Sequence, residues 1–71
     1  MKKNYDIVYV VYNEFDATSE LFKTLEVAKK YRDVCIFSKE GYMPTTKKQT
    51  KYLIKEYRGD IYIDKRKVWK S

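Results

Sequence analysis

The sequence predicts an α+β domain, a small antiparallel sheet with one long helix packed on one face, in the order β-β-α-β-β. A run of β-branched and aromatic residues at 5–12 predicts a strand, and residues 24–41 combine helical periodicity with a start and a stop signal. Two further β-rich runs flank a Gly-Asp turn at 59–60. The 71 residues have the length of a single domain, spanning 1–71. The alternative is β-α-β-α-β, with a parallel strand pair and a second helix.

The first half of the chain favours a hairpin. Residues 5–12, YDIVYVVY, are apolar on both faces, which is typical of a central or doubly covered strand. Residues 13–19, NEFDATS, are rich in turn formers. We expect 20–23 to pair back on the first strand, because Thr24 is a natural helix cap. In the alternative, Ser19 is the cap and the helix begins early.

The central helix is predicted over 24–41. Thr24 can cap the first turn, and Gly41 can adopt the left-handed conformation that commonly ends a helix. Four apolar residues at 34–37 leave an alternative, in which the helix stops at Asp33 and a buried strand follows. The apolar face expected for the continuous helix comprises Leu25, Ala28, Tyr31, Val34 and Cys35.

The C-terminal third allows two interpretations. Residues 52–57 and 61–64 suit the strands of a second hairpin, and this interpretation is favoured. The rival is a helix over 46–58, with its face formed by Thr50, Leu53, Ile54 and Tyr57 and its end capped by Gly59. Residues 65–67, KRK, are expected to form an exposed turn or tail. The core is expected to be completed by Ile61, Ile63, Val68 and Trp69.

The composition argues against an enzyme or a cofactor-binding protein. The chain has no histidine, which removes the commonest general base and metal ligand, and its two glycines form no phosphate-binding loop. Cys35 lies in an apolar run and is expected to be a core residue. We therefore expect no catalytic residues, no metal and no cofactor. Without an apolar run long enough to span a bilayer or a secretory signal, we expect a cytoplasmic protein with no membrane partner.

The charge of the chain is unevenly distributed. Residues 1–46 carry seven basic and seven acidic side chains, whereas 47–71 carry nine and three, so the whole net charge of +6 lies in the last third. Lysines there alternate with aromatic residues, a combination that suits phosphates and bases or an acidic protein surface. The predicted partner- or nucleic-acid-binding residues are Lys47, Lys48, Lys51, Tyr52, Lys55, Tyr57, Arg58, Tyr62, Lys65, Arg66, Lys67 and Trp69.

A resemblance adds to this expectation. The order YVVYNEFDATSELFKTLEVAKKYRD followed by KYLIKEYRGDIYID resembles small uncharacterised phage- and prophage-encoded accessory proteins of A/T-rich bacteria. The resemblance implies a non-catalytic accessory or inhibitor role inside a bacterial host, and it transfers no functional residues. We expect a host or phage protein as the partner, docked on the Tyr-rich, basic surface. The alternative partner is DNA or RNA, bound by residues 47–70.

Overall fold

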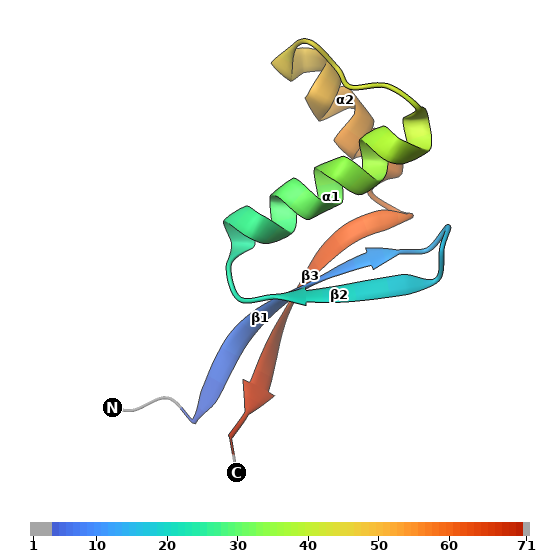
Figure 1. The fold of residues 1–71 in the computed structure, drawn as a ribbon. Coiled ribbons are helices and arrows are strands. Elements are labelled where there is room, and N and C mark those ends of the chain that lie inside the picture. The colour runs from blue at the N-terminus through green and yellow to red at the C-terminus, as the bar shows by residue number, and fades with distance from the viewer. Residues whose placement is uncertain (1–3, 71) are drawn as a thin grey trace.

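The computed structural model describes residues 4–70 and confirms an α+β fold with a small antiparallel sheet. The element order, however, is β-β-α-α-β, so the fourth strand and the single helix of the favoured prediction are wrong (Figure 1). The elements are β1 (Tyr5–Asn13), β2 (Thr18–Phe22), α1 (Leu25–Glu40), α2 (Lys47–Tyr57) and β3 (Ile61–Trp69). The alternative prediction had the second helix but not the sheet, in which every strand pair is antiparallel.

The sheet has the order β2-β1-β3, so β1 is the central strand, as its two apolar faces predict. The predicted hairpin between β1 and β2 is confirmed. β2 pairs with β1 only from Tyr9 to Asn13, whereas β3 pairs along all of β1. Residues 5–8 and 66–69 therefore continue beyond β2 as a two-stranded extension, which we call the ribbon. Figure 1 shows the ribbon projecting away from the two helices.

α1 begins and ends where the sequence predicts. The Thr24 hydroxyl accepts a hydrogen bond from the Val27 N–H at 3.3 Å. Gly41 has a φ of 89° and donates its N–H to the carbonyl of Phe37 at 2.8 Å. The helix runs unbroken through 34–37, which excludes the alternative strand.

The core lies between α1, the sheet and the inner side of α2, and its fully buried residues are Val11, Ala28, Ile36, Leu53 and Ile61. The predicted face of α1 is only partly correct. Val34 is 62% exposed, while Ile36 is fully buried. Side chains two positions apart in a helix differ by about 200° around its axis, so Val34 and Ile36 point in nearly opposite directions. Leu25 is also exposed, whereas Tyr31 and Cys35 are half-buried against the core.

The segment 46–58 is a helix because its apolar residues recur every three or four positions and meet α1. Thr46 caps it by accepting the N–H of Gln49 at 3.1 Å, and Leu53 is buried in the core. The predicted strand at 52–57 is therefore wrong. Gly59 is not the left-handed cap either, since Gly41 is the only described glycine with a positive φ.

β3 corrects two further predictions. Ile61 is buried as expected and Ile63 packs against the core, but Val68 is 49% and Trp69 66% exposed. Residues 65–67 form neither a turn nor a tail, because they are paired with β1 inside the strand. The physical reason is the length of β1. Its first residues offer backbone partners to β3 beyond the part of the sheet that α1 covers (Figure 1).

Candidate binding surfaces

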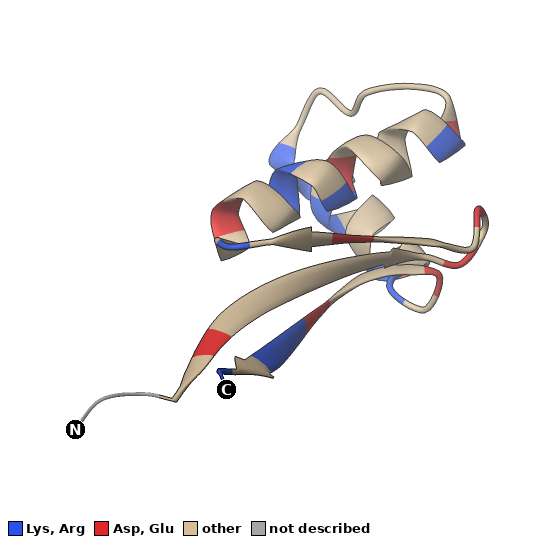
Figure 2. Cartoon of the chain, turned by 60° about the horizontal axis from the view of Figure 1, so that its bottom comes forward, with Lys and Arg blue, Asp and Glu red and all other residues tan. Residues whose placement is uncertain are grey.

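The structure separates the twelve predicted site residues into two groups. The α2 group, on α2 or directly after it, is Lys47, Lys48, Lys51, Tyr52, Lys55, Tyr57 and Arg58. The β3 group is Tyr62, Lys65, Arg66, Lys67 and Trp69. β3 leaves the α2 end of the molecule and runs eight steps of about 3.3 Å each, or about 26 Å, to its far end. The far members of the β3 group therefore lie well away from α2, and Figures 1 and 2 show α2 and the far end of β3 in different parts of the molecule.

The α2 group forms a basic outer face. Leu53 points into the core, so Lys48, Lys51 and Lys55 project on the opposite side of the helix and are exposed. Tyr52 is 61% exposed beside them. Tyr57 is not part of this face, because it packs against the core and its hydroxyl donates a hydrogen bond to Glu40 at 2.5 Å.

The β3 group is divided again by the alternation of the strand. Tyr62 and Arg66 lie on the sheet face turned away from the helices. Lys65, Lys67 and Trp69 lie on the opposite face, which is the one that α1 covers nearer the other end of β3. On the former face the cations are paired. Arg66 Nε lies 3.0 Å from Asp64 Oδ2, and this hydrogen bond raises the pKa of the guanidinium. Lys70 Nζ likewise lies 3.4 Å from Asp6 Oδ1.

The other side of the ribbon, together with the adjoining pair Tyr9 and Lys65, places lysines beside aromatic rings, and we call it the aromatic face. It comprises Tyr5, Ile7, Tyr9, Lys65, Lys67 and Trp69, and none of these residues is acidic. Tyr5 and Trp69 are cross-strand partners in an edge-to-face contact, with ring centroids 4.9 Å apart. Lys67 Nζ lies 4.8 Å from the Tyr5 centroid and 6.0 Å from that of Trp69. Within residues 4–70, neither Lys65 nor Lys67 forms an ion pair.

Tyr5, Ile7 and Tyr9 were missed by the sequence prediction. They lie about sixty residues from Lys65, Lys67 and Trp69 in the chain, and only the antiparallel register brings the two sets onto one face. The signal available beforehand was the alternation of 5–12, in which these residues share one face. That pattern does not reveal which strand lies beside them.

Three carboxylates that are spaced by four in the sequence, Glu56, Asp60 and Asp64, do not form one site. Glu56 and Asp60 line a hollow of about 290 Å³ with Glu40, Tyr52 and Tyr57, whereas Asp64 is paired on β3. The charge of the nearby Glu56 raises the pKa of Tyr52. Among the described residues no group of three or more side chains is placed to hold a metal ion. No helix between residues 4 and 70 is both long and apolar enough to cross a membrane.

The Tyr57–Glu40 contact makes stability depend on pH. Its hydrogen bond raises the pKa of Tyr57 above the ordinary value of 10, and the charges of Glu40 and Asp60 and the nearby Tyr42 act in the same direction. The contact therefore stabilises the fold below pH 10 and is lost as the pH rises through the raised value. We expect the advantage of the wild type over Tyr57→Phe in urea unfolding to shrink above pH 10.

Glu40→Gln is the matched control for this experiment, because the amide keeps an acceptor but removes the charge. When Glu40→Gln is present, the loss of stability caused by Tyr57→Phe should depend less on pH. A wild-type advantage that stays constant, or grows, above pH 10 would show that the hydrogen bond does not favour the neutral phenol.

Comparisons with protein-family models, curated proteins and solved structures found no match to this chain. The resemblance to phage accessory proteins therefore stays a prediction.

Proposed function

We propose that this protein is a non-enzymatic binding protein that holds single-stranded nucleic acid on the aromatic face of the ribbon. The observation that carries the proposal is the combination on one face of the exposed Trp69 ring with Lys65 and Lys67, neither of which has a carboxylate partner within residues 4–70. Lysines neutralise phosphates, and aromatic rings stack on the flat faces of bases. A single strand of nucleic acid carries phosphates and bases in alternation.

The arrangement favours a single strand over the other anionic partners. A duplex keeps the flat faces of its bases inside the stack, so it would meet the lysines and leave the aromatic rings without stacking partners. An acidic protein surface would likewise satisfy the lysines alone. The distribution of charge supports the choice of this face, because on the opposite face of the sheet Arg66 is paired with Asp64 and Lys70 with Asp6.

Titration of fluorescent single-stranded DNA and RNA tests this proposal. The wild type should bind with an affinity that falls as salt rises, and the double variant Lys65→Ala/Lys67→Ala should reduce the logarithmic salt slope by about 1.4. Trp69→Ala should weaken binding by about 5- to 150-fold while leaving the salt slope nearly unchanged, because stacking releases no counterions.

The matched control is Lys47→Ala/Lys51→Ala, which makes the same change of charge on α2. It should leave the affinity close to that of the wild type. Equal losses in the two double variants would show that binding follows net charge and not the ribbon. No binding at low salt by the folded wild type would overturn the proposal.

A protein partner, expected first from the sequence, is the second candidate. It is favoured by the outer edge of β1 at residues 5–8, which β2 leaves unpaired, because a partner's extended segment can add a strand to such an edge. A phage accessory or inhibitor role would take this form. Such docking would protect those amide groups of 5–8 that point to the free edge from hydrogen exchange, without requiring Lys65 and Lys67.

A further inference from the structure

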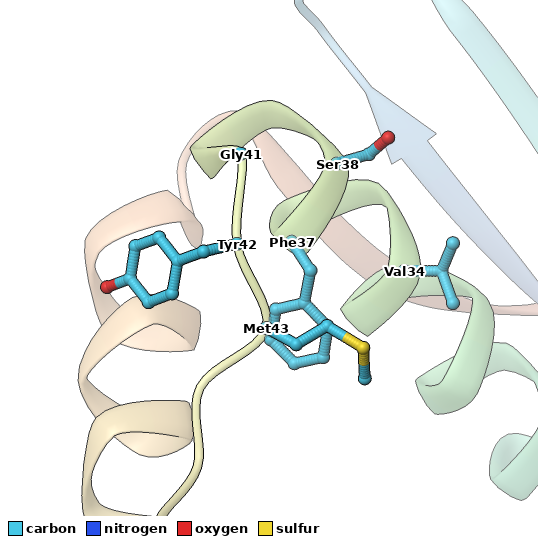
Figure 3. Close-up of a pocket in the computed structure, with 6 residues that line it drawn as sticks. All are labelled: Val34, Phe37, Ser38, Gly41, Tyr42 and Met43. Carbon is cyan, nitrogen blue, oxygen red and sulfur yellow. The ribbon is translucent and has the colours of Figure 1, made fainter.

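One side of α1 carries an uncharged hollow that the other residues of the described range 4–70 leave open. It has a volume of about 450 Å³ and is lined by Val34, Phe37, Ser38, Gly41, Tyr42 and Met43, which we call the α1 patch. No lining residue is charged, although 37% of the chain is. Figure 3 shows Val34 and Met43 on the same side of the helix end, with Tyr42 pointing the other way, toward α2.

Several large apolar side chains are exposed on this fold. Six hydrophobic residues are buried among those described, whereas ten large hydrophobic residues are exposed. Three of the ten, Val34, Tyr42 and Met43, belong to the α1 patch, with exposures of 62%, 51% and 74%. A chain this short buries a smaller fraction of its surface than a longer one does, and association is one way for a small domain to gain further burial.

We propose that the α1 patch is the interface of a homodimer. A second copy is the occupant because the patch offers both a projecting apolar side chain and a hollow that can receive one. Met43 forms one wall of the hollow and is 74% exposed, so a two-fold axis lets Met43 of each copy pack into the hollow of the other. Methionine adapts its shape to such a cavity, and the small Ser38 lets the backbones approach.

The charges around the patch permit this contact despite the net charge of +6. A neighbouring hollow shares Val34 and Ser38 with the patch, and its rim carries both Asp16 and Lys39. Both signs are therefore present at the edge of the interface, and each copy can offer the other an opposite charge. The basic outer face of α2 and the ribbon lysines lie outside this patch.

Light scattering coupled to size-exclusion chromatography tests the dimer. The wild type should have twice the monomer mass of 8.6 kDa, and Val34→Lys should be monomeric at the same concentration. Two lysines brought together in an apolar interface should weaken association by more than about 100-fold. Because Val34 is largely exposed in the monomer, the variant should keep its helical circular dichroism.

The control is Leu21→Lys, which adds the same charge at a leucine that is 66% exposed on the opposite face of the sheet. It should remain dimeric. The thermal midpoint should rise with protein concentration for the wild type and Leu21→Lys, but not for Val34→Lys. A folded wild type that stays monomeric at high concentration overturns the proposal and leaves the patch to another protein. A dimer that survives Val34→Lys, or is lost in Leu21→Lys, overturns it as well.

Discussion

Replacing Ile36 with alanine should lower the free energy of unfolding by about 2–5 kcal/mol. Ile36 is fully buried at the centre of the core, so the change removes transfer free energy and also leaves a cavity. At about 0.05–0.15 kcal/mol per residue, a chain of this length has a total stability of about 4–11 kcal/mol. The variant should therefore lose a large part of its folded population, as measured by urea denaturation followed by circular dichroism.

This substitution also separates packing from helix propensity. Alanine is the best helix former, so α1 taken alone should become more stable in the Ile36→Ala variant. Leu21→Ala is the control, because it removes a similar side chain from a position that is 66% exposed, and it should cost less than about 1 kcal/mol. Equal costs for the two variants would show that the core does not depend on Ile36.

Replacing Asn13 with alanine should cost about 2 kcal/mol, because this side chain holds the turn between β1 and β2. Its Oδ1 accepts the N–H groups of Phe15 and Asp16 at 3.1 and 3.4 Å, and its Nδ2 donates to Asp16 Oδ2 at 3.1 Å. Asn13 is only 7% exposed. The same turn places Ala17 at a φ of 54°, which costs about 1–2 kcal/mol for a residue with a Cβ. The hydrogen bonds of Asn13 offset that strain.

Asp16→Ala is the matched control for the turn. It removes the bond to Asn13 Nδ2 but keeps both backbone donors on Asn13 Oδ1, so its cost should be about half as large. Urea denaturation measures both variants, and amide hydrogen exchange on β2 should accelerate more in Asn13→Ala. If Asp16→Ala proves the more destabilising of the two, the turn is held by the carboxylate and not by the two backbone contacts.

The helix α1 and the strand β1 could be predicted because their signals are local. The Thr24 cap and the left-handed Gly41 act within one helical turn, and the β-branched residues of 5–12 favour extended backbone on their own. The segment 46–58 could not be assigned in this way. Its sequence suits both a strand pair and a helix, and burial of Leu53 against α1 selects the helix.

The basic character of the last third was determined by the sequence alone, since charge needs no fold to be counted. Which of its residues lie together was decided by the tertiary structure. The register of β1 with β3 places Tyr5 and Tyr9 beside Lys65 and Lys67, and the alternation of the strand turns Arg66 to the other face. Strand pairing joins residues some sixty positions apart through backbone hydrogen bonds that have the same form for any side chain. A pattern of side chains along one segment therefore cannot specify its neighbour across the sheet.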